Sequence, residues 1–365
     1  MKTECLFIVN GLGMGNSTRC FAIMEHLHDR GASIHVLTSG NGLEFFQDKK
    51  EVASLTPMPS FFYAVKHGRI SAWQTIASLR VLAQRAREKK AQLEKLLSAI
   101  RPDVAVFDSE YIVGPCHRRH IPVVGLNNSE VVVSEYLRAP NNPPSVRSQF
   151  WCIEFSDYLF HRTCCDLVLS SAPLPTLPRH PRFKRIGLIF RRTLLPEILL
   201  AANKPLVRPR QLKNLLFMLS GSIHASPLSF AKSRFPFHID VVGRSGESKG
   251  DVVFHGRVMN NIDLLMKADA LVVNGGYSAF SEAVALGKPT VIIPVAGHAE
   301  QLVNARFVEQ LGAGFIASDT TVMDKIEACY EANEWLGLKP RPQDLQLDGA
   351  TQATAAILAL AEKRS

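Results

Sequence analysis

A short turn made of Asn274, Gly275 and Gly276 follows the apolar run ALVV and precedes a helical pattern that begins near Ser278. Unpaired N–H groups and the dipole at the start of a helix favour an anionic ligand, and a glycine turn lets a diphosphate approach the backbone. Glu282 follows one helical turn after Ser278, on the same face. There a carboxylate can accept hydrogen bonds from both hydroxyls of a ribose attached to that diphosphate.

A second strand–turn–helix unit follows directly, and it also carries polar side chains at its turn. The strand PTVIIPV leads to the stretch GHAEQ, which places Glu300 and Gln301 on a loop or on the first turn of the next helix. These side chains can form hydrogen bonds with the hydroxyls of a sugar. The two units in this order predict a site for a nucleoside diphosphate that carries a sugar at its far end.

The N-terminal stretch NGLGMGNSTR also has glycines at a strand-to-helix junction, at Gly11, Gly13 and Gly15. This spacing differs from the GxGxxG of dinucleotide-binding proteins, and the second strand, SIHVLTSGNG, lacks the terminal acidic residue that would hold an NAD ribose. A dehydrogenase is therefore disfavoured. Asn16 follows the last glycine; because an amide takes no proton at neutral pH, it can bind a ligand but cannot act as a general base.

Both loops belong to series of short apolar strands that alternate with helical patterns. The first half contains the strands CLFIVN, SIHVLTS, VAVFDS, IPVVGLN and DLVLSSA, and the second half contains NLLFMLSG, FHIDVVG, VVFHGRV, ALVVNG and PTVIIPV. Apolar strands without alternation, separated by helices, indicate parallel sheets that are covered on both faces. The predicted fold class is therefore α/β, with two doubly wound, Rossmann-like domains.

A proline-rich stretch between Ala172 and Lys184 marks the change from the first domain to the second, because proline at that density continues neither helix nor sheet. We expect residues 1–184 to form the N-terminal domain, residues 185–211 a linker, and residues 212–345 the C-terminal domain. The last helix, in residues 346–365, can pack back on the N-terminal domain. Residues 71–100 repeat apolar side chains at helical spacing, which predicts a long helix with a basic outer face.

Composition narrows the classes of partner and compartment. The chain has 365 residues, a net charge of +9 and seven cysteines without a CxxC pair, so we expect reduced thiols rather than disulfides or a zinc site. No apolar run reaches the roughly 20 residues of a membrane helix, and MKTE starts no secretory signal, which favours a cytoplasmic protein. Without an RNA-binding motif, a zinc finger or a basic tail, we expect a phosphate-bearing ligand and no nucleic acid.

The region from Asn274 to Gly314 resembles the donor-binding signature of GT-B glycosyltransferases, which include the lipid II-forming N-acetylglucosaminyltransferases and the macrolide and plant-type enzymes. The resemblance implies two Rossmann-like domains that face each other across a cleft. It also implies that the second domain binds a nucleotide-diphosphate sugar, preferably a UDP-sugar, whose sugar is moved to an acceptor hydroxyl.

The resemblance also assigns the donor-binding residues one by one. The diphosphate would be held by Gly275, Gly276 and Ser278 beside Asn274, the ribose by Glu282, and the donor sugar by Glu300 and Gln301. Val258 would read the base through its backbone, and the loop below the phosphate would be formed by Ser220, Gly221 and Ser222. Ala279 departs from the pattern, since many relatives carry Ser or Thr at that position, and this removes one hydrogen bond to the phosphate.

The N-terminal loop resembles the GxGHxxR loop of the same family, with Asn16 at the position of the histidine. The residues that the resemblance places at the acceptor side of the cleft are Gly13, Gly15, Asn16, Arg19 and Glu130. In plant-type relatives an aspartate supports the histidine, and the matching residue in RPDVAVFDSE is Asp108. We expect Asp108 to act as the general base, with Glu110 and then Glu130 as alternatives. A helix cap or a hydrogen-bonded loop residue is the other interpretation of Asp108.

The predicted reaction follows from two absences in the sequence. Retaining GT-B enzymes of the glycogen-synthase type carry a second glutamate eight positions after the first, but Thr290 occupies that position, so we expect inversion. There is no convincing DxD metal motif, so helix N-termini and loop amides would stabilise the departing diphosphate without a metal or another cofactor. Two alternatives are a nucleotide-sugar hydrolase, with water as the acceptor, and a nucleotide-sugar-binding protein without catalysis, which Asn16 suggests.

The stretch SFFYAVKHGRISAWQ raises the question of a membrane partner. It combines cations with aromatic residues, namely Lys66, Arg69, Phe61, Phe62, Tyr63 and Trp73. Aromatic rings beside cations suit a peripheral contact with an anionic membrane, which fits a lipid-linked acceptor. Alternatively, the aromatic side chains belong to the core and the positive charge attracts the nucleotide diphosphate.

Overall fold

The structure is a computed structural model that describes residues 2–59, 65–66, 69–70, 79–203, 211–219, 234–339 and 344–363. The chain forms two compact units. Unit 1 contains Met1–Val131, Phe155–Ile189 and Gln346–Ser365, and unit 2 contains Val132–Glu154 and Phe190–Leu345. Two segments are separated in the sequence from the rest of their unit: Val132–Glu154 belongs to unit 2, and Gln346–Ser365 belongs to unit 1. The domain boundaries expected at residues 184, 211 and 345 did not assign Val132–Glu154 to the second unit.

Unit 1 is built on a seven-stranded parallel sheet with the order β3-β2-β1-β6-β7-β8-β9. Its strands are β1 (Glu4–Val9), β2 (Ser33–Thr38), β3 (Val52–Pro57), β6 (Val104–Asp108), β7 (Val123–Leu126), β8 (Leu167–Ser171) and β9 (Phe183–Ile186), and a separate antiparallel pair consists of β4 (Val65–Lys66) and β5 (Arg69–Ile70). Its helices are α1 (Met14–Asp29), α2 (Asn41–Phe46), α4 (Leu79–Ile100), α5 (Gly114–His117), α8 (Phe155–Cys164) and α14 (Gly349–Glu362). Helix α6 (Ser129–Arg138) begins in unit 1 and ends in unit 2.

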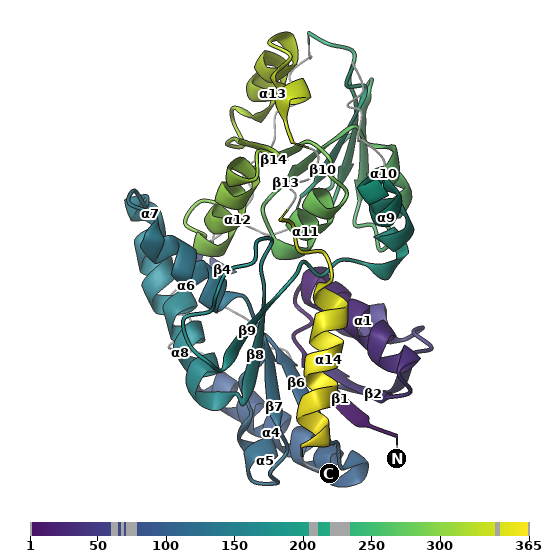
Figure 1. Ribbon diagram of the computed structural model, residues 1–365, viewed down its shortest axis with the longest axis vertical. Coiled ribbons are helices and arrows are strands. Elements are labelled where there is room, and N and C mark those ends of the chain that lie inside the picture. Colours follow the sequence, from purple (N-terminus) through teal and green to yellow (C-terminus); the bar gives the residue numbers. More distant parts are fainter. Residues whose placement is uncertain are drawn as a thin grey trace. The chain divides into compact units, whose positions relative to one another are not determined.

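Helix α14, near the C-terminus, completes unit 1 by packing against α1, β6 and β9 (Figure 1). The start of α14 packs closely on the backbone after β9, because a Cβ added at Gly349 would lie 2.1 Å from the carbonyl oxygen of Gly187. The N–H of Gly187 donates a hydrogen bond to Oε1 of Gln352 in α14, at 2.9 Å. Residues from the two ends of the sequence therefore share one core.

Unit 2 is built on a six-stranded parallel sheet with the order β12-β11-β10-β13-β14-β15. Its strands are β10 (Asn214–Met218), β11 (His238–Val242), β12 (Val252–Gly256), β13 (Ala270–Val273), β14 (Thr290–Ile292) and β15 (Gly314–Ile316). Its α-helices are α7 (Pro144–Gln149), α9 (Leu195–Asn203), α10 (Ile262–Lys267), α11 (Tyr277–Ala285), α12 (Ala299–Gln310) and α13 (Val322–Glu331). The π-helix η1 (Phe150–Glu154) and the 3₁₀-helices η2 (Arg192–Leu194) and η3 (Glu334–Gly337) also belong to this unit.

All ten predicted strands are confirmed, and the long helix predicted in residues 71–100 is observed as α4 from Leu79 onward. The strands that were not predicted are the two-residue strands β4 and β5 and, in the two large sheets, β3, β9 and β15. Strands β3, β9 and β15 each lie at an edge of their sheet, and each is partly exposed. An edge strand needs fewer apolar residues than a central one, because only one side of it is covered by a neighbouring strand.

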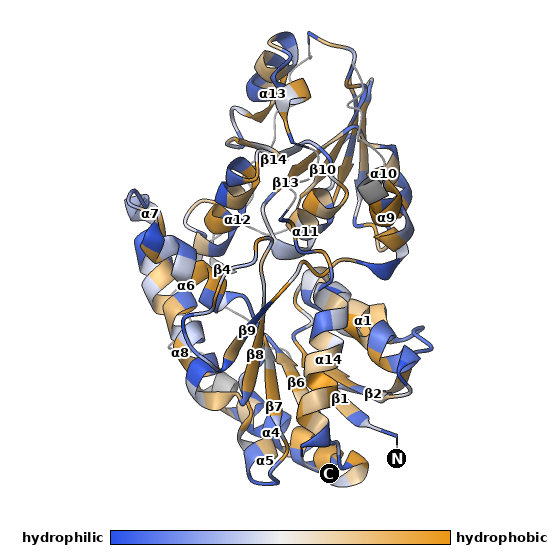
Figure 2. Cartoon of the chain, in the orientation of Figure 1, coloured by the Kyte–Doolittle hydropathy of each residue, from blue (hydrophilic) through white to orange (hydrophobic). Residues whose placement is uncertain are grey.

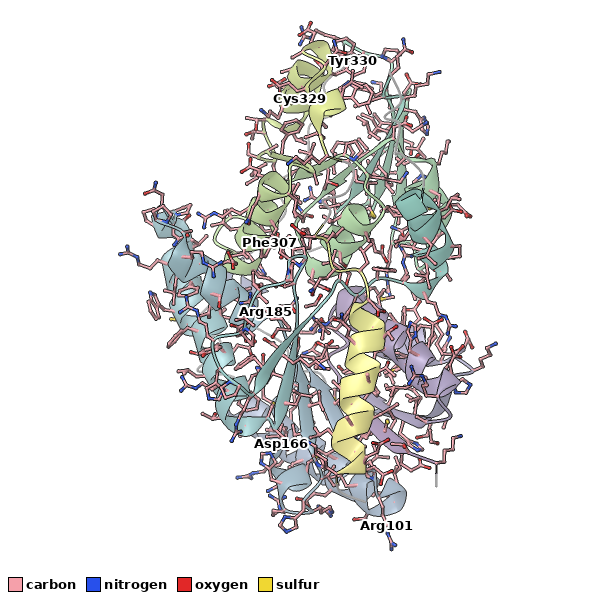
Figure 3. All side chains as sticks on the ribbon, in the orientation of Figure 1. Arg101, Asp166, Arg185, Phe307, Cys329 and Tyr330 are labelled. Carbon is pink, nitrogen blue, oxygen red and sulfur yellow. The ribbon has the colours of Figure 1, made fainter. Side chains whose placement is uncertain are left out.

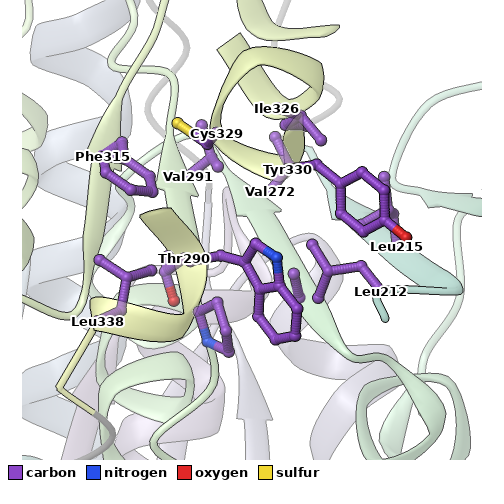
Figure 4. Close-up of a pocket in the computed structure, with 13 residues that line it drawn as sticks. Leu212, Leu215, Val272, Thr290, Val291, Phe315, Ile326, Cys329, Tyr330 and Leu338 are labelled. Atoms are coloured by element: carbon purple, nitrogen blue, oxygen red, sulfur yellow. The ribbon is translucent and has the colours of Figure 1, made fainter. Parts of the chain in front are cut away.

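The central strands of both sheets are the apolar cores of their units, and most of their residues are coloured as hydrophobic in Figure 2. In β1, for example, Leu6, Phe7 and Val9 are completely buried. Unit 2 encloses a small cavity of about 30 Å³, whose lining includes Leu215, Val272 and Ile326 (Figure 4). Its lining is almost entirely apolar, so the cavity is a packing gap of the core.

Each sheet has one point at which the strand order reverses direction. In unit 1 this switch point lies between β1 and β6, and in unit 2 it lies between β10 and β13. Ligands of doubly wound folds bind at the carboxyl ends of the strands beside such a point. The glycine stretch that starts at Asn10 follows β1, and the turn that starts at Asn274 follows β13, so both predicted glycine loops lie at switch points.

Candidate functional site

The glycine turn of unit 2 has a backbone that only glycine adopts without strain. Gly275 has a φ of +81°, and a Cβ added to it would lie 3.0 Å from Cγ2 of Ile292 and 3.1 Å from the carbonyl oxygen of Gln301. Next to it, Gly276 is the N-cap residue of α11, and a Cβ added there would meet no atom within 4 Å. The start of α11 therefore has open space in front of its backbone, as a diphosphate site requires.

Two buried asparagines hold this turn in place. Nδ2 of Asn274 donates a hydrogen bond to the carbonyl oxygen of Ile293, at 3.1 Å. Nδ2 of Asn304, in α12, donates to the carbonyl oxygen of Gly275, at 2.8 Å. Asn304 was not predicted as a site residue, and its only signal in the sequence is its place three residues after Gln301 on the same helix.

Glu282 lies in α11, is only 4% exposed, and is paired with an arginine that the sequence analysis missed. Nε and Nη2 of Arg191 donate hydrogen bonds to Oε1 and Oε2 of Glu282, at 2.6 and 2.7 Å. A carboxylate has about four lone-pair positions, so this bidentate pair leaves two of them for other donors. Arg191 therefore orients Glu282 without using up its capacity to accept hydrogen bonds.

The start of α12 carries the two residues predicted to meet the donor sugar. Oε1 of Gln301 accepts a hydrogen bond from the N–H of Val295, at 2.9 Å, so this oxygen holds the preceding loop together. The half-buried Glu300 lies in the first turn of α12. Within the part of the chain that the structure describes, no hydrogen bond or ion pair is recorded for its carboxylate, so Glu300 can accept from a ligand.

Of the remaining residues predicted to bind the donor, two are described by the structure and three are not. Ser278 and Val258 are half-buried, Ser278 in the first turn of α11 and Val258 after β12. Ser220, Gly221 and Ser222 lie outside the described residues. The aromatic residues of the predicted membrane contact, namely Phe61, Phe62, Tyr63 and Trp73, also lie outside them.

In unit 1, Asp108 is the last residue of β6, is completely buried, and is engaged by several donors. Nε of Arg19 donates to its Oδ2 at 2.6 Å, and Nη2 donates to its Oδ1 at 2.5 Å. The thiol of Cys20 and the hydroxyl of Ser109 also donate to it, each at 3.2 Å. Burial, followed by the charge of Asp108, raises the pKa of the Cys20 thiol well above its usual value. This geometry makes Asp108 the anchor of Arg19 and α1.

The N-terminal glycine stretch lies beside Asp108 at the switch point of unit 1. The N–H of Asn10 donates to the carbonyl oxygen of Asp108, and its side chain donates to that of Ser109. Gly13 is the N-cap residue of α1, and Gly15 and Asn16 follow in its first turn. Nδ2 of Asn16 lies 3.5 Å from the carbonyl oxygen of Asn10, a long contact that leaves the amide able to bind a ligand.

Glu110 forms a buried ion pair with Lys89 of α4, and both side chains are 2% exposed. Nζ of Lys89 donates to Oε1 and Oε2 of Glu110, at 2.9 and 2.7 Å. Burial raises the pKa of Glu110, and Lys89 opposes that shift. Burial also lowers the pKa of Lys89, and Glu110 opposes that shift. The pair is therefore closer to exchanging a proton than an exposed Lys–Glu pair is.

Glu130, the third predicted carboxylate, is completely buried at the start of α6. Its oxygens accept hydrogen bonds from Nε and Nη2 of Arg185, at 2.9 and 3.2 Å, and from the N–H of Arg179, at 2.9 Å (Arg185 is labelled in Figure 3). The three predicted acids of unit 1 thus share a feature that the sequence did not indicate, since each is buried against a cation. Only the partner of Glu110 is a lysine; the other two are arginines, which stay protonated.

A comparison with protein families decides the class of this protein. The profile of glycosyl transferase family 1 matches residues 3–329. The chain belongs to this family. Two relatives support it: an uncharacterized glycosyltransferase of Methanosarcina acetivorans is 25% identical over 99% of this chain and 98% of its own length, and one of Methanosarcina mazei is 23% identical over 89% and 88%.

Solved glycosyltransferases share the fold of this family member at low sequence identity. The calicheamicin glycosyltransferase CalG4 matches with a TM-score of 0.61 and 17% identity, over 100% of this chain and 99% of its own. MurG of Acinetobacter baumannii matches with a TM-score of 0.60 and 13% identity, over 98% and 99%. SsfS6 of Streptomyces sp. SF2575, complexed with thymidine diphosphate, matches with a TM-score of 0.56 and 14% identity, over 99% and 98%. The predicted GT-B fold, with two Rossmann-like domains, is confirmed.

The family also confirms that the protein is an enzyme of the transferase class. Among the helices within the described ranges, none is both long and apolar enough to cross a bilayer. The roles assigned above to individual residues stay predictions.

Proposed function

We propose that this glycosyltransferase moves a hexosyl group from a nucleotide-diphosphate sugar, preferably a UDP-sugar, to an acceptor hydroxyl, with inversion at the anomeric carbon. One observation carries this proposal. Glu282 lies one turn into α11, behind the open start of the helix, and Arg191 is the only hydrogen-bond donor to its carboxylate among the described residues, which leaves each oxygen one lone pair for a ligand. Two acceptors side by side match the two neighbouring hydroxyls of a ribose whose diphosphate lies at the start of α11.

The order of the groups along the sheet of unit 2 supports the position of the sugar. The start of α12 follows β14, the strand next to β13, and Asn304 joins α12 to the glycine turn. A group attached to the diphosphate at α11 therefore reaches the first turn of α12, where Glu300 can accept hydrogen bonds from sugar hydroxyls. The bound thymidine diphosphate of SsfS6 is consistent with a nucleoside diphosphate as a ligand of this fold.

In the reaction, the acceptor oxygen attacks the anomeric carbon and forms the new glycosidic bond. The bond from that carbon to the phosphate oxygen breaks, and its electron pair leaves with the diphosphate. The N–H groups at the start of α11 stabilise the charge of the leaving group without a metal. The proton of the acceptor hydroxyl must go to a base.

For that base we propose Glu110 in preference to Asp108. Both oxygens of the Asp108 carboxylate already accept hydrogen bonds, from Arg19, Cys20 and Ser109, so Asp108 is poorly placed to accept a further proton from the acceptor hydroxyl. Glu110 follows the same strand end, and its lysine partner can share a proton with it. In this scheme Asp108 and Glu130 are positioning residues that fix Arg19 and Arg185.

Incubation with a panel of nucleotide sugars and candidate acceptors tests the proposed function, with the products identified by mass spectrometry. A transferred sugar with inverted configuration supports the proposal. Free sugar in the absence of an acceptor would instead support the hydrolase alternative, and binding without turnover would support the non-catalytic alternative. A lipid-linked acceptor, with the protein at an anionic membrane surface, is the acceptor class that we propose to test first.

A further inference from the structure

Helix α12, whose first turn carries Glu300, is held at its start by a side chain from the first half of the sequence. The N–H of Ala299, the first residue of α12, donates a hydrogen bond to Oε1 of Gln149, at 2.9 Å. Gln149 is the last residue of α7, 150 positions earlier in the sequence. His298, the N-cap residue of α12, makes no capping hydrogen bond with its own side chain. Gln149 therefore takes the place of a local cap.

The position of the Gln149 side chain is itself fixed by packing. Its Nε2 donates a hydrogen bond to Oε1 of Glu154, at 2.7 Å, and Glu154 is buried at the end of η1. Phe150, the first residue of η1, is completely buried and stacks on Tyr136 with 3.7 Å between the ring centroids. The Gln149 amide is therefore held at both ends, its oxygen by Ala299 and its nitrogen by Glu154.

A second contact joins the same segment to the later part of α12. Nη1 of Arg306 donates to Oδ1 of Asn142 at 2.7 Å, and Nη2 donates to the carbonyl oxygen of Asn141 at 2.9 Å. Ala299 and Arg306 are two helical turns apart, or about 10 Å along the axis. We call residues 141–154 the α7–η1 segment. It holds α12 at two points, one of them directly beside Glu300.

The nucleotide end of the proposed donor site is held by another part of the chain. Arg191 pairs with Glu282 in α11, whereas the α7–η1 segment contacts α12. A change at Gln149 acts first on the N-terminal residue of α12, whereas Asn304, five residues further along α12, still holds the glycine turn and Arg191 still holds Glu282.

We propose that Gln149 is a positioning residue that fixes Glu300 relative to the donor sugar, so that the α7–η1 segment contributes to the choice of sugar. This inference rests on the proposed function and deepens it. It predicts that the affinity for a nucleoside diphosphate and the affinity for the corresponding nucleotide sugar respond differently to changes at position 149.

The test compares Gln149→Met, Gln149→Glu and the double variant Gln149→Glu with Glu154→Gln. Calorimetry gives the dissociation constants of UDP and of the UDP-sugar that the wild-type enzyme transfers best, and initial rates give kcat/KM. Gln149→Met keeps the size of the side chain but removes the hydrogen bond. We expect it to leave UDP affinity within about twofold and to lower kcat/KM for the UDP-sugar by about 10- to 100-fold.

The other two variants separate a hydrogen-bond role from general packing. Gln149→Glu places two carboxylates in contact and should lose as much as Gln149→Met. In the double variant the carboxylate at position 149 accepts from Ala299 and from the amide at position 154, so the same network forms again. We expect kcat/KM of the double variant to return to within about threefold of wild type, with all variants checked by thermal unfolding.

Three results would overturn the inference while leaving the proposed function intact. They are an unchanged kcat/KM for folded Gln149→Met, an equal loss of affinity for UDP and for the UDP-sugar, and no recovery in the folded double variant. If the wild-type protein bound neither UDP nor any nucleotide sugar of the panel, the proposed function itself would fail, and this inference with it.

Discussion

Removal of the Glu282 carboxylate gives a direct test of the ribose site. In Glu282→Ala, two hydroxyls lose their charged acceptor, and the net loss should be about 2–3 kcal/mol of binding free energy, or roughly 30- to 150-fold in affinity. Glu282→Gln keeps one oxygen acceptor and loses the charge, so we expect a loss of about tenfold. Both variants should weaken UDP and UDP-sugars equally, because the ribose is common to both.

The stability of these variants can also be estimated from the exposure of the two partners. The Arg191 side chain is 20% exposed, so its guanidinium can still reach water in Glu282→Ala. We therefore expect the free energy of unfolding to fall by about 1–2 kcal/mol in this variant. Glu282 is 4% exposed, so Arg191→Met would leave a buried, unpaired carboxylate at a cost of about 3–5 kcal/mol. Glu282→Ala is therefore the better variant for binding measurements, and urea denaturation checks both estimates.

A matched ligand makes the test specific for the ribose. We would measure the affinities of UDP and of 2′-deoxy-UDP for the wild-type protein and for Glu282→Ala by calorimetry. If Glu282 accepts from both hydroxyls, the wild-type protein prefers UDP and the variant loses most of that preference. A variant that remains folded and keeps the wild-type preference would refute the assignment of Glu282 to the ribose.

Three further predictions concern the other parts of the site. Asp108→Asn should destabilise the protein by about 3–5 kcal/mol in urea denaturation, because it leaves the guanidinium of Arg19 buried without its carboxylate; a loss of activity without any loss of stability would restore Asp108 as the candidate base. A base must be ionised to act, so the raised pKa of Glu110 places the acid limb of the kcat/KM profile above the ordinary pKa of glutamate. Lys89→Arg should move that limb to lower pH, because arginine stays protonated. Identical pH profiles for the wild-type enzyme and Lys89→Arg would exclude the pair from proton transfer. Gly275→Ala should lower UDP affinity by about tenfold or more in calorimetry, because φ is +81° and the new methyl group would press on Gln301; unchanged affinity would place the diphosphate elsewhere.

Local patterns in the sequence were sufficient for the fold and for the two glycine loops. A central parallel strand is buried on both faces, so it must be an apolar run, and such a run is visible without any knowledge of its neighbours. A glycine turn between a strand and a helix is equally local, and its position fixes the start of the helix. Strand β3 is half-exposed and lacks a full apolar run, so the same pattern did not reveal it.

The partners of the acidic residues could not be predicted from the sequence. Arg19 lies 89 positions from Asp108, Arg191 lies 91 positions from Glu282, and Gln149 lies 150 positions from Ala299. No periodicity or motif links residues at such separations, and only packing of the whole unit decides which cation meets which carboxylate. The sequence therefore determined which strand each carboxylate ends or follows. The tertiary structure decided which of them are paired with an arginine and which one is paired with a lysine. It also decided that Gln149, from the first half of the chain, accepts a hydrogen bond from the first residue of α12.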